Sequence, residues 1–110
     1  IFRRTADDAR VYLKWMEPAA IRSVARRYFA QGDGAEAEFA LLAAIGKQRD
    51  AGQENGDTWA DLGVTLYEVG KKKQSLAALL HAIDAGVTRT EIVASALHVA
   101  RELELVAHAK

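Results

Sequence analysis

The chain has 110 residues, with 15 Lys and Arg against 15 Asp and Glu, 50% hydrophobic residues and no cysteine. A net charge of zero argues against a dedicated nucleic-acid binder, because phosphate contacts require an excess of basic side chains. The lack of cysteine excludes disulfide scaffolds and thiol chemistry, and no apolar run approaches the roughly 20 residues that span a bilayer. The composition therefore predicts a soluble, Ala-rich helical domain in a reducing, cytoplasmic compartment, with no membrane or nucleic-acid partner.

Apolar residues recur at steps of three and four along the chain, which is the period of amphipathic helices, and no segment alternates as a strand does. With Pro18 and the glycines as boundaries, this spacing predicts an all-α fold of about six helices. The expected ranges are 5–16, 18–31, 34–46, 57–69, 72–85 and 89–108.

The first expected helix belongs to an N-terminal flanking segment, residues 1–17. Its opening, IFRRTADDAR, mixes basic with acidic residues and precedes no long apolar stretch, so we expect no secretory signal. Four large apolar side chains should share one side of this helix and cover one end of the fold. They are Val11, Tyr12, Trp15 and Met16.

Glycines mark the expected turns. Gly32 and Gly70 should reverse the chain after the second and fourth helices, and Gly86 stands where the fifth helix should end. The stretch from Gly46 to Asp57, GKQRDAGQENGD, is polar and contains three glycines, so we expect it to be a loop.

The segment 18–51 superposes on the segment 56–89 without a gap, so that position 18 falls on position 56. Matched positions agree in size or are both large and apolar, which indicates a repeated helix–turn–helix unit. Small residues at the matched positions 25 and 63 should let the two helices of each hairpin approach closely. The pairs are Ile21/Trp59, Val24/Leu62, Ala25/Gly63, Tyr28/Leu66, Gly32/Gly70, Ala37/Ser75, Leu41/Leu79 and Ala44/Ala82.

The run WADLGVTLYEVG, followed by SLAALLHAI, resembles the tetratricopeptide repeat, whose unit of about 34 residues carries W-x2-L-G-x2-Y on its first helix. Five residues match the pattern: Trp59, Leu62, Gly63, Gly70 and Ala82. In the second unit Leu66 and Ser75 depart from it, and in the first unit Ile21 replaces the tryptophan.

The resemblance implies a right-handed superhelix of stacked antiparallel hairpins. Residues 18–51 and 56–89 would be two units, and 90–110 a capping helix or a partial third unit. Because the offset between the two units exceeds the usual unit length by four residues, we expect the extra residues to lie in the 46–57 loop.

In this family the first helix of each unit lines a concave groove that binds a peptide or helix. Two aromatic residues, Phe29 and Tyr67, would be apolar anchors, and Arg22 and Arg26 would bind an acidic group of the partner. Apolar residues stand where the family's clamp for carboxylate termini needs polar ones. The resemblance implies a partner-binding face formed by Arg22, Arg26, Phe29, Ala60, Val64, Tyr67 and Glu68.

A second resemblance leads elsewhere. DAGVTRTEIVASALHVA is similar to the segment that follows the active site in the carboxymuconolactone decarboxylase and alkyl hydroperoxidase D family. That family's Cys-x-x-Cys-x-x-x-His motif would fall on Lys71, Gln74 and Ala78, and none of these can perform thiol chemistry. The alternative is therefore a degenerate helical oligomer without redox cysteines.

Charge is segregated along the chain, with net values of +4 over residues 1–30, −6 over 31–68 and +2 over 69–110. This pattern fits a structural subunit of a larger assembly, and self-association could also seal the ends of so short a repeat.

No catalytic group is expected. His81, His98 and His108 lack the helical spacing of metal ligands, and acidic pairs at one- or two-residue steps point apart on a helix. The sequence therefore predicts a non-catalytic interaction module, without metal or cofactor, that binds a protein or peptide partner.

Overall fold

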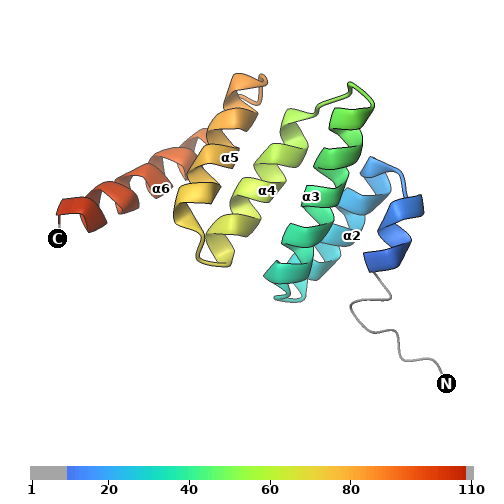
Figure 1. Ribbon diagram of the computed structural model, residues 1–110. Helices are drawn as coiled ribbons and strands as arrows, with labels where there is room; N and C mark the ends of the chain where they lie inside the picture. The colour runs from blue at the N-terminus through green and yellow to red at the C-terminus, as the bar shows by residue number, and fades with distance from the viewer. Residues whose placement is uncertain (1–9, 109–110) are drawn as a thin grey trace. The chain divides into compact units, whose positions relative to one another are not determined.

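Every described segment of regular structure is helical, as the apolar period predicts. The computed structural model describes residues 10–108 (Figure 1). Residues 10–12 form helix that leads into a 3₁₀-helix, whereas positions 5–9 of the expected first helix lie outside the described residues. The elements are η1 (Leu13–Trp15), α2 (Pro18–Ala30), α3 (Gly34–Asp50), α4 (Gly56–Glu68), α5 (Lys72–Asp84) and α6 (Thr90–His108). Within this range no helix is both long and apolar enough to cross a bilayer.

The chain divides into two units between Glu54 and Asn55, a point that lies between the two expected repeats. The first unit holds η1, α2 and α3, and the second holds α4, α5 and α6. In the first, α2 and α3 form an antiparallel hairpin, and in the second, α4 and α5 do the same (Figure 1).

The two hairpins turn in the same way, with equivalent hydrogen bonds at the matched positions of the repeat. Both turn glycines have positive φ, 81° at Gly32 and 86° at Gly70, a conformation that disfavours any residue with a Cβ. Each turn closes with the pair of bonds that ends many helices. These are Gly32 N to Phe29 O and Gly70 N to Tyr67 O, both 3.0 Å, and Asp33 N to Tyr28 O and Lys71 N to Leu66 O, 2.8 and 2.9 Å.

Helix α3 does not end at residue 46 as expected. It continues to Asp50, so the connection to α4 is confined to residues 51–55. The glycine at 46 is tolerated because the turn around it is held by the buried side chains of Ile45 and Gln48. Lys47 and Arg49 also stabilise the last turn, where the helix dipole favours cations.

This longer helix accounts for the irregular offset. Helices α2 and α4 begin at Pro18 and Gly56, an interval equal to the offset between the two repeated segments. Helices α4 and α6 begin at Gly56 and Thr90, which is a shorter interval. The second interval equals the usual tetratricopeptide unit of about 34 residues. The four extra residues of the first interval therefore form one additional turn of α3, and the expectation that they lie in a loop was wrong.

The N-terminal segment, which is part of the first unit, buries Leu13, a residue outside the expected set. Leu13 is buried and Met16 is half-buried, whereas Val11, Tyr12 and Trp15 are exposed, the last by 84%. Polar contacts with α3 hold the segment in place. The Arg10 guanidinium donates two hydrogen bonds to the Glu36 carboxylate, at 2.6 and 3.1 Å, and lies 4.2 Å from the centre of the Phe39 ring. Lys47 Nζ donates to Lys14 O at 2.9 Å and to Met16 O at 2.5 Å.

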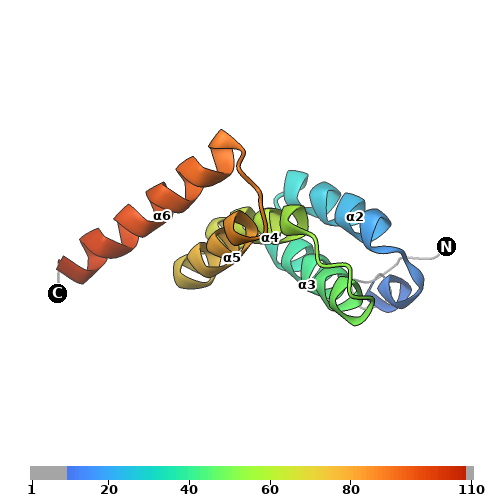
Figure 2. The ribbon, with the colours of Figure 1, turned by 90° about the horizontal axis from the view of Figure 1, so that it is seen from above.

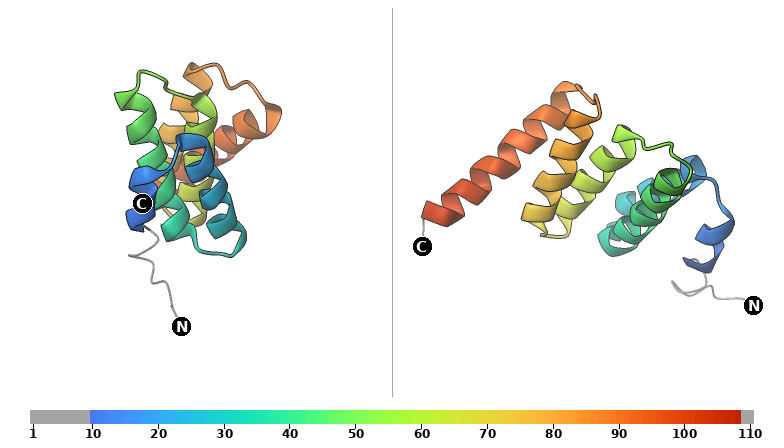
Figure 3. Two further views of the ribbon diagram at one scale, coloured as in Figure 1. Left: turned by 90° about the vertical axis from the view of Figure 1, so that its right-hand side faces the viewer. Right: turned by 45° about the horizontal axis from the view of Figure 1, so that its top comes forward.

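In the second unit α5 packs between α4 and α6, as the right-hand view of Figure 3 shows. The apolar core joins all three helices through Ala60, Leu79, Ala82, Val87, Ile92, Ala96 and Val99. Trp59 lies half-buried against this core, with its ring centre 4.2 Å from that of His81. At the matched position of the first hairpin, Ile21 is fully buried.

Candidate functional site

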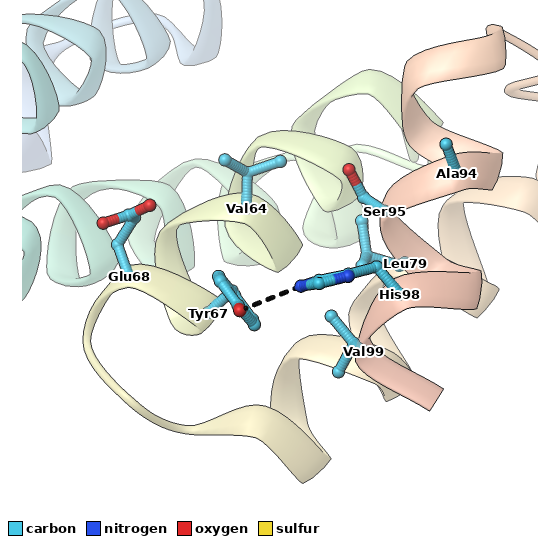
Figure 4. A pocket seen from close by; sticks show the side chains of 8 residues that line it. All are labelled: Val64, Tyr67, Glu68, Leu79, Ala94, Ser95, His98 and Val99. Atoms are coloured by element: carbon cyan, nitrogen blue, oxygen red, sulfur yellow. Dashed lines mark hydrogen bonds between the residues drawn. The ribbon is translucent and has the colours of Figure 1, made fainter. Parts of the chain in front are cut away.

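A pocket of about 370 Å³ opens in the second unit between α4 and α6. Figure 4 shows side chains of α4 on one side, side chains of α6 on the other, and Leu79 of α5 behind them. The lining residues are Val64, Tyr67, Glu68, Leu79, Ala94, Ser95, His98 and Val99.

The pocket follows from how α6 packs. Helix α6 lies chiefly against α5 and diverges from α4, as the view from above shows (Figure 2). Leu79 and Val99, both buried, form an apolar base, and Val64 adds an apolar wall. On the α6 side the short side chains of Ala94 and Ser95 leave the space open.

A network of polar side chains ties the three helices together at Tyr67 and His98. The Tyr67 hydroxyl donates to Glu102 Oε1 at 2.5 Å and lies 3.2 Å from His98 Nε2. That histidine nitrogen is 2.5 Å from the same carboxylate oxygen, and Lys72 Nζ lies 2.7 Å from Glu102 Oε2. Glu102 is thus the shared acceptor of groups from α4, α5 and its own helix.

These contacts shift the pKa values of their members. The hydrogen bond from Lys72, followed by that from Tyr67, lowers the pKa of Glu102 to about 2. The same bonds to Glu102 raise the pKa of Tyr67 and the pKa of Lys72. Near neutral pH the cluster therefore contains a carboxylate, an ammonium and a protonated phenol.

The structure brings three of the seven expected partner-binding residues together. Val64, Tyr67 and Glu68 all line the pocket. Ala60 does not, because it is fully buried in the core of the second unit. The remaining three, Arg22, Arg26 and Phe29, lie on α2 in the first unit, where the phenylalanine is partly exposed.

The α6 side of the pocket was not identified from the sequence, because His98 was considered only as a possible metal ligand. A second offset contains the signal. Because α4 and α6 begin one ordinary repeat unit apart, Ala94 and His98 are the counterparts of Ala60 and Val64. Extending the repeat by one more unit would have selected both.

The positions on which the alkyl hydroperoxidase D motif would fall do not form a site. Gln74 is exposed on α5, Ala78 is buried in the hairpin, and neither lines the pocket. Among residues 10–108, no group of three or more His, Asp or Glu side chains is arranged to hold a metal ion.

Comparisons with protein-family models, curated proteins and solved structures give no significant match to this chain.

Proposed function

We propose that the chain is a non-catalytic protein-interaction module whose pocket between α4 and α6 holds one apolar side chain of a partner peptide or helix. The observation that carries the proposal is the pocket itself, with its base of Leu79 and Val99 and its wall of Val64. Its volume, about 370 Å³, lies in the range of ligand pockets and accommodates a leucine or phenylalanine side chain. A buried anchor of this kind supplies most of the binding energy in many interfaces.

The repeat supports the same function. The matched turns of the two hairpins, and the ordinary unit spacing of α4 and α6, favour a tetratricopeptide-like array. In such an array α4 and α6 are the first helices of successive units and line the concave side. The pocket lies between these two helices, where a bound peptide is expected, and we propose the right-handed superhelix on the same grounds.

The chemistry beside the pocket favours binding over catalysis. A general base works best with a pKa near the operating pH. The pKa of Glu102, at about 2, makes its carboxylate a weak base, and the raised pKa of Tyr67 keeps the phenol protonated. The network is suited to hold α6 in position and keep the pocket open.

The test is a peptide-display selection on the full chain, followed by affinity measurement for the selected peptides. Ala94 is an exposed alanine that lines the pocket, so Ala94→Trp should fill it without removing a core residue. Ala77→Trp makes the same change at an exposed position of α5 that does not line the pocket.

We expect the selected peptides to share an apolar residue. Ala94→Trp should weaken their binding by tenfold or more, roughly the loss of one anchor, and Ala77→Trp should leave it unchanged. Equal affinity for both variants, or a selection that yields no peptide, would refute the proposal.

A further inference from the structure

The pocket has an acidic side. Of its eight lining residues, Glu68 alone has a carboxylate, and none is a lysine or an arginine. Glu68 is exposed at the last position of α4. Within the described residues no hydrogen bond or ion pair engages its side chain. It therefore presents a negative charge that is not held in an ion pair beside the apolar wall.

Further acidic residues follow the same side of α4. Two of them, Asp57 and Asp61, precede Val64 and Glu68 on α4. The successive steps of four, three and four residues place all four on one helical face. Arg89 pairs with Asp57 at 2.6 Å, so part of this charge is neutralised at the beginning of the helix. Glu68 has no such ion pair within the described residues.

The carboxylate of Glu102, which holds the polar network beside the pocket, already has partners. Glu102 accepts from Lys72 and Tyr67, and its low pKa reflects this full set of partners. A bound cation would gain little there because it would have to displace an existing ammonium. The attractive charge is therefore that of Glu68.

We propose that the partner segment is basic, with a Lys or Arg placed about one helical turn from the apolar residue that enters the pocket. Val64 and Glu68 are four residues apart on α4, and side chains at this spacing lie about 5–6 Å apart. A helical partner would match them with an anchor and a cation at i and i+3 or i+4, and an extended one at i and i+2. The inference rests on the function proposed above and deepens it.

A basic partner has the opposite charge to the acidic partner expected from Arg22 and Arg26 on α2. Those arginines belong to the first unit, whereas the apolar pocket belongs to the second. Because the anchor contributes most of the binding, the charge beside the anchor determines which peptides bind best.

The experiment uses three fluorescent peptides with one leucine anchor and Lys, Gln or Glu at the neighbouring position, titrated into the full chain. We expect the Lys peptide to bind about fivefold more tightly than the Gln peptide, equivalent to one favourable surface ion pair. The Glu peptide should bind most weakly, and salt should reduce the differences.

Glu68→Lys should reverse this order. Glu17→Lys, which makes the same change of charge at an exposed residue of the first unit, should preserve it.

The outcomes separate the two proposals. If all three peptides bind equally and Ala94→Trp abolishes their binding, the basic partner is refuted and the apolar pocket stands. The same holds if the Glu peptide binds best. If no peptide binds, or if Ala94→Trp has no effect, both proposals are refuted.

Discussion

The Ser75 hydroxyl donates a buried hydrogen bond of 2.6 Å to the carbonyl oxygen of Gly63, joining α5 to α4. The bond is possible because Gly63 has no side chain and lets α5 come close to the α4 backbone. In the first hairpin the matched positions are Ala37 and Ala25, which are buried but cannot form such a bond. The second hairpin thus has a hydrogen bond between its two helices that the matched positions of the first hairpin cannot form.

Gly63→Ala should destabilise the second unit. A Cβ at this position would lie 2.6 Å from Leu79 Cγ and 3.2 Å from the backbone nitrogen of the same residue, so the helices would have to separate. Overpacking of this kind costs about 1–3 kcal/mol. Urea denaturation followed by circular dichroism should show the loss, and Gly63→Leu should show a larger one.

Gly46→Ala is the matched control for this substitution. Gly46 lies inside α3 and is exposed, and a Cβ there would meet no atom within 4 Å. Alanine is the better helix former, so this variant should be more stable by about 0.5–1 kcal/mol. If both variants shifted the urea midpoint in the same direction, the close approach at Gly63 would be disproved.

Ser75→Ala should cost about 1 kcal/mol of unfolding free energy, because it removes one buried hydrogen bond while keeping the packing. Ser23→Ala is the comparison, since the Ser23 hydroxyl bonds only within its own exposed helix turn. That change should stay within about 0.5 kcal/mol of the parent. Equal stability of the two variants would mean that the bond between the hairpin helices contributes nothing.

The repeat offset predicted the contacts within a hairpin well. It identified Gly63 as a position of close approach, and it identified the turn glycines Gly32 and Gly70, whose positive φ values match that role. Such features depend on residues close in sequence, and residue size and backbone freedom indicate them directly. The extra turn of α3 was missed because a glycine inside a polar run has the same local pattern in a loop and in a helix.

The α6 side of the pocket depends on contacts between distant segments. Nothing local distinguishes His98 or Glu102 from other polar residues on an exposed helix face. Their role comes from the distance at which α6 packs beside α4, and from the ammonium of Lys72 at the beginning of α5. The two α6 residues stand one ordinary repeat unit after Val64 and Glu68, so only the repeat spacing points to them.

Lys47→Met should loosen the N-terminal segment. The ammonium of Lys47 donates to the carbonyl oxygens of Lys14 and Met16, so it closes the end of the short 3₁₀-helix. Methionine keeps most of the aliphatic length but cannot donate. Amide hydrogen exchange over residues 13–17 should become several-fold faster, with little change in α4 and α5.

Lys73→Met is the control for this effect. Lys73 is exposed in the first turn of α5, so its loss should leave exchange in the N-terminal segment at the parental rate. Unchanged exchange over residues 13–17 in Lys47→Met would show that the two hydrogen bonds do not hold the segment.

The stability supplied by Glu102 should depend on pH in a defined direction. The pKa of its carboxyl is about 2 in the folded chain, against an ordinary value of 4.5. The folded state therefore binds the proton less readily than the unfolded state, and the stabilisation is fully present above about pH 5. It is lost as the pH falls toward 2, when Glu102 becomes protonated and no longer pairs with Lys72.

Glu102→Gln should accordingly lower the melting temperature at pH 7, and the difference in melting temperature from the parent should close between about pH 5 and pH 2. Glu17→Gln, the same change at an exposed residue, should leave the melting temperature near the parental value at pH 7. A gap for Glu102→Gln that stayed constant down to pH 2 would attribute the loss to side-chain shape and not to the ion pair.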